Sequence, residues 1–402
     1  MFVFLPLRMK VKATCKYILP GFFIWYLLAC NTNTPKSEDV ARADTIDETV
    51  GALPLEVKSP ADNPSTPQKI ELGRLLFYDP VLSGEKDVSC ASCHHPEYGY
   101  AESQELSIGV NGTGLGEMRQ FNDPNDIPFS KRNSQSILNA AFNGINTSGE
   151  YTPETAPMFW DLRTQSLEQQ SLKPIGTLEE MRGRGHEEAI ELDSITGRLK
   201  AIPEYKKLFA EAFAEREAIT VLNLSKAIAA FERTLTANNA PFDKYMRGDK
   251  TALSISEKDG FELFKQAGCA KCHKGPMFSD FKLHVLGVPD NEKLNAPDLG
   301  AGNKNAFRTP TLRNLRYTDP FMHNGKLKTL ENVMELYEDV AGDKSQNPRI
   351  SPEQLDPLAR KTKISVKDFK SIIQFLNTLN DDTFDRKIPA RIPSGLKVGG
   401  NI

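Results

Sequence analysis

Two short segments of the chain, residues 90–94 and 269–273, both have the pattern Cys-x-x-Cys-His. At this spacing two thiols can bond to a haem as thioethers while the following histidine ligates its iron. Paired cysteines also suit a four-cysteine zinc site or two disulfides, but the histidine directly after both pairs favours haem. The sequence therefore predicts two covalently bound haem c groups. They would be held by Cys90, Cys93, His94, Cys269, Cys272 and His273.

The other two of the six cysteines lie in an N-terminal segment typical of an export signal, so none remains for a structural disulfide. Basic residues precede an apolar run over residues 17–29, which is too short to span a bilayer. The run ends in Leu-Leu-Ala-Cys, which resembles a bacterial lipoprotein signal. We predict a signal peptide over residues 1–30 and a lipid anchor at Cys30, on the periplasmic side of the bacterial envelope. Ordinary cleavage without lipidation is the alternative, because Leu28 is unusual at its position.

The charge of the chain argues against one class of partner. Removing residues 1–30 takes away four of the 50 basic residues and none of the 53 acidic ones, which leaves a net charge of −7. An acidic chain without a basic patch is not typical of nucleic-acid binding. It would suit a basic patch on an electron-donating protein, although mild acidity is also common on soluble surfaces.

The length behind the signal predicts more than one domain. Residues 31–52 are poor in large apolar side chains and read as a flexible tether. Cys90 and Cys269 lie 179 residues apart, which predicts two haem domains over residues 53–215 and 216–380. A C-terminal tail, residues 381–402, would be free to pack back on the N-terminal domain.

A short internal echo supports two similar halves. Residues 73–77 and 260–264 both read Gly-x-x-Leu-Phe and precede the two motifs, so each is expected to lie in a helix that leads into Cys-x-x-Cys-His. Pro67 suits the first turn of one helix, and Ser256 with Asp259 suggests a capping box for the other.

Helical periodicity predicts further helices. Apolar stripes at helical spacing comprise Val221, Leu224, Ile228, Phe231 and Leu235, and then Phe369, Ile372, Leu376 and Leu379 behind a Ser365/Asp368 capping box. Residues 107–128 and 287–304 are rich in Gly, Pro and Asn and show no strand alternation. The predicted fold is mainly α, with two cytochrome c-like haem domains and long loops.

Several further motifs resemble those of the bacterial diheme cytochrome c peroxidase family, which includes MauG. The resemblance runs from about Leu53 to Asn380, and Leu162 departs from it because the family usually has glycine there. It is carried by LFYDP at 76–80, KRNS at 131–134, FWDLR at 159–163, FRTPTLRN at 307–314 and TDPFMHNG at 318–325. The resemblance implies reduction of hydrogen peroxide to water with electrons from a small cytochrome c or cupredoxin, and family members often form homodimers.

The family's site residues can be carried over by motif. The resemblance implies that His94 is the proximal ligand of the peroxidatic haem and His273 that of the haem that relays electrons. It implies that Glu180 is the catalytic glutamate, with Gln170 beside it. Without the family, the neighbouring Glu179 has an equal claim to that role.

Trp160 is the only tryptophan behind the signal. The resemblance implies that it mediates electron transfer between the two haems. A buried aromatic at the interface between the domains is the structural alternative, and both readings are compatible.

One departure from the family concerns the first haem. Conventional members have an inhibitory histidine within the segment that matches residues 107–112, where this chain has Val110. Because valine cannot ligate iron, we expect this haem to be open in the oxidised protein, without reductive activation.

The second departure concerns the other haem. The family's usual methionine ligand matches the position of Tyr337, which is tyrosine in MauG also. Met334 lies on the same face of the helix that Thr329 is expected to begin, so it remains an alternative to Tyr337, as does Met322. His323 is expected near this haem in a supporting role.

A calcium ion is also implied by the resemblance, held by an Asn133 side-chain oxygen and the carbonyl oxygens of Thr318 and Pro320. Three histidines receive no role: His95, His186 and His284.

The favoured interpretation is a cytochrome c peroxidase. A MauG-like enzyme that oxidises a protein substrate is the first alternative, favoured by Val110 and Tyr337. A noncatalytic diheme electron carrier is the second, although it would have no use for Gln170 and Glu180.

Overall fold

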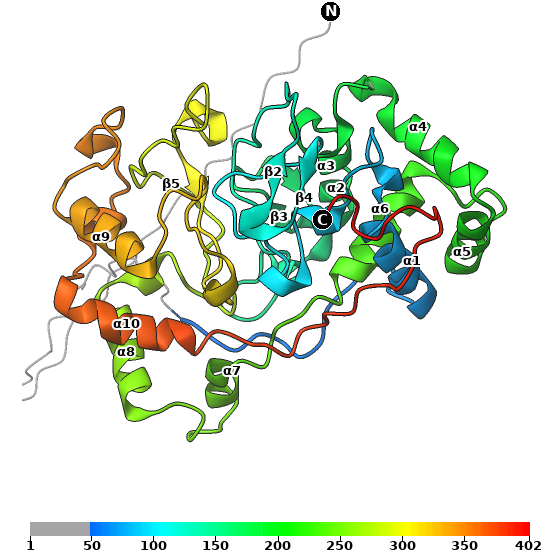
Figure 1. Cartoon of the computed structure of the whole chain (residues 1–402). Coiled ribbons are helices and arrows are strands. Elements are labelled where there is room, and N and C mark those ends of the chain that lie inside the picture. Colours follow the sequence, from blue (N-terminus) through cyan, green and yellow to red (C-terminus); the bar gives the residue numbers. More distant parts are fainter. Residues whose placement is uncertain (1–48, 186) are drawn as a thin grey trace, which may run out of the picture. The chain divides into compact units, whose positions relative to one another are not determined.

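The computed structural model describes residues 49–402 except residue 186 (Figure 1). The expected signal peptide, the anchor at Cys30, His186 and most of the tether lie outside the described residues. Helices dominate what is described, as the sequence predicts. They are α1 Pro67–Phe77, α2 Leu167–Gln170, α3 Lys173–Gly176, α4 Glu188–Ala201, α5 Pro203–Phe213, α6 Val221–Glu232, α7 Pro241–Met246, α8 Ile255–Gln266, α9 Leu330–Ala341 and α10 Val366–Asn377.

Strands are short, and long loops connect the helices. In the described part of the chain the strands are two residues long and form three antiparallel pairs. They are β1 Gly112–Thr113 with β2 Gln120–Phe121, β3 Pro157–Met158 with β4 Thr164–Gln165, and β5 Leu283–His284 with β6 Phe307–Arg308.

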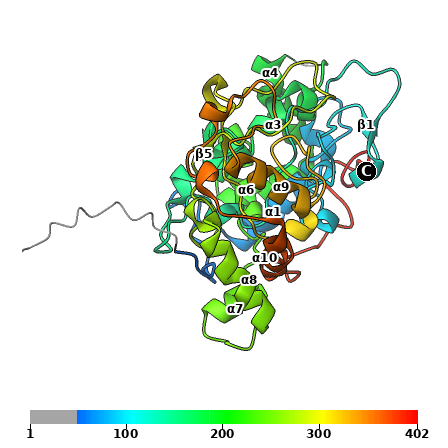
Figure 2. The ribbon, with the colours of Figure 1, turned by 90° about the vertical axis from the view of Figure 1, so that its left-hand side faces the viewer.

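The sequence echo corresponds to a repeated helix pair. Helix α1 packs on α6, and α8 packs on α10. A Cβ atom on Gly73 of α1 would lie 2.0 Å from the carbonyl oxygen of Ala227, and one on Gly260 of α8 would lie 2.0 Å from that of Ser371. Each helix pair therefore depends on a glycine for its close approach. Figures 1 and 2 show α8 beside α10 in both views.

Aromatic side chains fill both helix crossings. Phe77 of α1 packs edge-on against Phe231 of α6, with ring centroids 5.3 Å apart. Phe264 of α8 lies against Phe375 of α10 at 5.1 Å. The two phenylalanines that end the echoed pentapeptides thus occupy matching places in two hydrophobic clusters.

The start of α8 differs from the prediction. Its N-cap is Ser254 rather than Ser256, with the Ser254 hydroxyl accepting from Glu257 N at 3.3 Å and the Glu257 carboxylate accepting from Ser254 N at 2.7 Å. Both serines precede an acid by three residues, and the earlier pair makes the reciprocal bonds of a capping box. The helix therefore begins two residues earlier than the later pair would allow.

The C-terminal tail, red in Figure 1, runs back past α1. Gly399 N donates to the Tyr78 carbonyl at 2.8 Å, and the Ser394 hydroxyl donates to Asp79 at 2.7 Å. Helix α6 falls in the range 216–380 predicted for the second haem domain, yet it packs on α1, and the described residues from 49 onward belong to one compact unit. The domain boundary at residue 215 stays a prediction.

Among the helices in the described part of the chain, none is both long and apolar enough to span a bilayer.

Candidate functional site

A large internal cavity borders both Cys-x-x-Cys-His motifs. Its volume is about 600 Å³. All the residues predicted to hold haem lie in its wall, as do those predicted for catalysis and electron transfer. They are Cys90, Cys93, His94, Cys269, Cys272 and His273, and then Trp160, Gln170 and Glu180.

The two motifs have the same local geometry. A short 3₁₀ turn begins at each first cysteine, Cys90–Ser92 and Cys269–Lys271. The backbone N–H of His94 donates to the Cys90 carbonyl at 2.9 Å, and His273 repeats this bond with Cys269 at 2.9 Å. The four cysteines are free of disulfide bonds, so their sulfurs are available for thioether formation.

Both imidazole rings are oriented as iron ligands require. The Nδ1 atom of His94 lies 3.0 Å from the Tyr100 carbonyl oxygen, and that of His273 lies 3.0 Å from the Phe278 carbonyl oxygen. A backbone carbonyl can only accept, so Nδ1 carries the proton and Nε2 keeps its lone pair for a metal. Burial lowers the pKa of both histidines, which keeps them neutral. The residues present therefore fit two haem groups.

Glu180 lies in a π-helical turn, Leu178–Arg182. Its backbone carbonyl accepts from Val110 N at 3.0 Å, so the loop that carries Val110 packs directly on this turn. The residue is half-buried and borders the cavity. Removal from bulk water, with a smaller effect from Glu179, raises the pKa of Glu180 to about 7. The carboxyl can then exchange a proton near neutral pH.

The loop over residues 107–112 borders the cavity only in part. Ser107 and Gly109 border it, whereas the Val110 side chain is buried in a hydrophobic cluster that includes Met181. A Cβ on Gly109 would lie 2.1 Å from the Glu180 carbonyl oxygen, so no side chain fits there. Among the described residues, this loop offers iron no imidazole.

Trp160 connects segments from the two halves of the chain. Its indole Nε1 donates to the Asn133 carbonyl at 3.0 Å, and its own carbonyl accepts from Arg308 N at 2.7 Å. The residue is 8% exposed and lines the cavity. The ring is therefore buried beside segments from both halves of the chain, and its role in electron transfer stays a prediction.

Helix α9 brings both candidate ligands to the cavity beside the second motif. The helix begins behind Thr329, as predicted, and Met334 and Tyr337 both line the wall. Met334 is 5% exposed and packs with Phe264 and Phe278. Burial raises the pKa of Tyr337, so its phenol is neutral in the protein alone. Met334 and Tyr337 therefore both remain candidates for the iron ligand of the second haem.

His323 is a buried neutral ring in the wall of the same cavity. It stacks on Phe307 with centroids 3.5 Å apart, and burial lowers its pKa to about 3. Its carbonyl accepts from Asn133 N at 2.8 Å.

The residues predicted to bind calcium also border the cavity: Asn133, Thr318 and Pro320. The Asn133 amide nitrogen donates to the Gln104 carbonyl at 2.6 Å. Within the described part of the chain, no hydrogen bond reaches the Asn133 Oδ1 atom or the other two residues' carbonyl oxygens. Such oxygens are the ligands that calcium prefers.

Sequence reasoning missed a buried carboxyl in the cavity wall. Glu232, the last residue of α6, is 5% exposed, and its Oε2 atom has no partner among the described residues. Burial raises its pKa to about 8. Its position, four residues after the buried Ile228, places it on the apolar face of the helix, which was the available signal.

His284, which received no role from the sequence, also borders the cavity, where it hydrogen-bonds two carboxylates close to Cys272. Of the other two unassigned histidines, His95 is buried beside the first motif and its ring accepts from Glu97 N.

Paired motifs around a shared cavity, with both imidazoles oriented for iron, define a diheme c-type protein. The family model of di-haem cytochrome c peroxidase matches residues 67–251. MauG of Methylorubrum extorquens is 32% identical over 376 residues, which cover 90% of this chain and 95% of that protein. Cytochrome c551 peroxidase of Nitrosomonas europaea is 31% identical over 341 residues, covering 83% and 86%. The chain belongs to the diheme cytochrome c peroxidase and MauG family, as its motifs predict.

Solved structures agree on the fold. A MauG-like protein associated with microbial copper homeostasis is 26% identical with a TM-score of 0.65, covering 88% of this chain and 96% of that one. The diheme peroxidase BthA of Burkholderia thailandensis is 21% identical with a TM-score of 0.61, covering 87% and 96%. Membership implies two haem c groups and an oxidoreductase that acts on peroxide-type substrates.

Proposed function

We propose that the protein is a cytochrome c peroxidase that reduces hydrogen peroxide to water. The observation that carries this is the placement of Glu180 and Gln170 in the same cavity wall as His94, beside a loop that presents no histidine. Cys90, Cys93 and His94 would hold the peroxidatic haem, whose iron binds peroxide and accepts electrons. Cys269, Cys272 and His273 would hold the electron-relaying haem.

The chain's own residues would handle the protons. Glu180 accepts the proton of one peroxide oxygen and returns it to the other, which then leaves as water. A carboxyl with a pKa of about 7 is suited to both steps near neutral pH. Gln170 can orient peroxide with its amide, because that amide both donates and accepts.

Electrons would enter through the second haem from a small cytochrome c or cupredoxin and pass by Trp160. The position of Trp160 supports this route, because its indole binds the Asn133 carbonyl and its own carbonyl binds Arg308 N. Net negative charge would favour a donor with a basic patch. We place the protein on the periplasmic side of the envelope, anchored through Cys30, and we propose a calcium ion at Asn133, Thr318 and Pro320.

MauG-like oxidation of a protein substrate is the second candidate. Tyr337 favours it by position, and so does the 32% identity to MauG. Steady-state turnover separates the two: consumption of peroxide coupled to oxidation of a reduced small cytochrome supports the peroxidase. If peroxide oxidises the haems but no small electron donor becomes oxidised, the MauG-like enzyme is favoured.

Low-temperature electron paramagnetic resonance of the oxidised protein tests the open first haem. A high-spin ferric signal that peroxide abolishes is expected. Two low-spin signals that do not respond to peroxide would contradict it, and would point to an electron carrier or to an enzyme that must first be reduced.

A further inference from the structure

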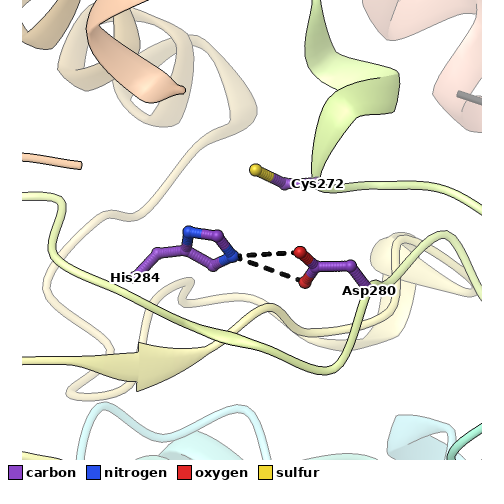
Figure 3. A group of neighbouring side chains, drawn as sticks. All are labelled: Cys272, Asp280 and His284. Carbon is purple, nitrogen blue, oxygen red and sulfur yellow. Dashed lines mark hydrogen bonds and ion pairs between the residues drawn. The ribbon is translucent and has the colours of Figure 1, made fainter. Parts of the chain in front are cut away.

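Beside the second motif, His284 faces the carboxylate of Asp280 close to Cys272 (Figure 3). His284, in strand β5, places its Nδ1 atom 2.8 Å from Asp356 and its Nε2 atom 3.1 Å from Asp280. The side chains are 10% exposed for His284, 17% for Asp356 and 3% for Asp280. Both ring nitrogens thus face acceptors, which requires a protonated ring.

The charge of this cluster follows from its bonds. Burial opposes the charged ring, but the hydrogen bonds to Asp280 and Asp356, followed by smaller effects of the free Cys272 thiol, outweigh it and raise the pKa of His284. The two carboxylate bonds are the part of this effect that remains when a thioether consumes the thiol. The same bonds hold the pKa values of both carboxyls below their usual range despite burial. One cation and two anions leave a net charge of −1. In the described part of the chain, no lysine or arginine makes an ion pair with either carboxylate.

The cluster is close to the point where the second haem attaches. The Cys272 sulfur, an Asp280 oxygen and a His284 nitrogen all lie within 4.8 Å of one another. This trio could resemble a metal site, but a thioether consumes the Cys272 thiol, and both nitrogens of His284 are already paired. The cluster is therefore better described as a fixed charge beside a redox centre.

The surrounding structure holds that charge in place. Asp280 also accepts from the Thr309 hydroxyl at 2.8 Å, next to Arg308, whose N–H binds the Trp160 carbonyl. Asp356 accepts from Leu358 N at 2.8 Å, just before a 3₁₀ turn that packs on α9. The carboxylates are thus anchored on both sides of the ring and cannot move away from it without breaking other bonds.

We propose that His284, Asp280 and Asp356 form a buried electrostatic unit that lowers the reduction potential of the second haem. A net negative charge near an iron centre stabilises its more oxidised and more positive state, and burial weakens solvent screening of that effect. The three are positioning residues: they act on the haem through charge and do not touch peroxide. The inference rests on the part of the proposed function that attaches a haem at Cys269 and Cys272, and it does not require peroxide turnover.

The decisive variant is Asp280→Asn with Asp356→Asn. Whichever protonation state His284 then adopts, the net charge of the cluster rises from −1 to zero or above. The expected result is an upward shift of the second haem's midpoint potential in a spectroelectrochemical titration of the holoprotein, with the first haem unchanged. The second haem's wave is identified as the one that disappears when Cys269 and Cys272 are replaced by alanine.

A pair of single variants separates charge from shape. Asp356→Asn keeps the size and removes the charge, so it should raise the potential at mildly acidic pH, where Asp280 keeps the ring protonated. Asp356→Glu keeps the charge and changes the shape, so it should stay near the wild-type potential. Asp343→Asn is the matched control, because it breaks only an exposed ion pair with Arg360.

Three results would overturn the inference. The first is an unshifted second potential in the double variant with both haems attached. The second is a shift of the second haem's potential in Asp356→Glu that is as large as the shift in Asp356→Asn, because this would indicate a structural role rather than a charge effect. This comparison tests the proposal even if the double variant fails to bind both haems. The third is a wild-type protein without a haem at Cys269 and Cys272, which would also refute the proposed function. If the wild-type protein carries two haems and turns over peroxide, the proposed function stands. The first two results then bear on the electrostatic proposal alone.

Discussion

The indole of Trp160 donates its only hydrogen bond to the backbone carbonyl of Asn133, at 3.0 Å. The side-chain oxygen of the same asparagine is one of the proposed calcium ligands. The ion and the aromatic ring thus share a single residue as support, so an effect on one should be detectable at the other.

Removal of calcium is therefore expected to disturb Trp160. Treatment with a calcium chelator should lower peroxide turnover and change the fluorescence of Trp160, the only tryptophan among the described residues, with haem content unchanged. Calcium should restore both signals and magnesium should not, because magnesium requires a tighter octahedral site. An Asn133→Ala variant should be insensitive to the chelator; equal sensitivity in that variant would exclude Asn133 from the site.

Glu180 is the residue on which the proton step depends. Glu180→Gln should lower peroxide turnover by about 100-fold or more, the usual contribution of a general acid–base group, while both haems still attach. Glu179→Gln is the matched control next door and should retain most activity. Full turnover in Glu180→Gln, or an equal loss in Glu179→Gln, would show that the proton-transfer assignment is wrong.

The same carboxyl predicts a pH profile. It must be ionised to accept the first proton, and burial raises its pKa to about 7. The value of kcat/KM should therefore rise as the pH increases through about 7, and this limb should be missing from whatever activity remains in Glu180→Gln. A limb that persists in the variant belongs to another group.

The ligand of the second haem can be decided by two substitutions. Tyr337→Phe should change the absorption spectrum of one haem only and raise its potential, because an oxygen ligand that favours ferric iron is lost. Met334→Leu should leave both haems as they are. The reverse pattern would make Met334 the ligand.

The parts of this fold that the sequence predicts are those set by local pattern. Apolar periodicity located α6 and α10, and the Gly-x-x-Leu-Phe echo located α1 and α8. That the glycines of this echo stand at helix crossings was seen only in the structure. The cap of α8 was misplaced by two residues, because Ser254 and Ser256 both precede an acid at the same spacing and only the hydrogen bonds distinguish them.

The parts of the site that the sequence does not predict depend on distant pairs. His284 gains its role from Asp356, 72 residues away, and neither position carries a motif. Glu232 carries no motif and was not singled out from the sequence, although its spacing from Ile228 puts it on the buried face of α6. Local pattern therefore identified the residues proposed to attach haem but not the charges around them.

The helix crossing at Gly73 should be intolerant of a methyl group. Gly73→Ala should destabilise the folded protein by about 1–3 kcal/mol, since the new Cβ would overlap the Ala227 carbonyl. Gly197→Ala is the control: it lies in α4 with nothing within 4 Å of the added carbon, so it should stabilise by roughly 0.5–1 kcal/mol. Chemical denaturation of both holoproteins measures this. Equal stability of the two variants would show that the crossing can relax.

Burial of Glu232 should make stability depend on pH. Its pKa in the folded protein is raised to about 8 from an ordinary value of 4.5, so between these values the unfolded chain has lost a proton that the folded protein keeps. The free energy of unfolding therefore falls as the pH rises through this range, and the loss is complete above about pH 8. Haem in the cavity would exclude further water and strengthen the effect.

Glu232→Gln is neutral at every pH and should lack this loss. Relative to wild type, its melting temperature should thus be higher at about pH 9 than at about pH 5. Glu211→Gln, at an exposed site in α5, should show the same difference from wild type at both values. If Glu232→Gln behaves like Glu211→Gln, the carboxyl ionises in the folded protein without cost, which would mean that water reaches it through the cavity.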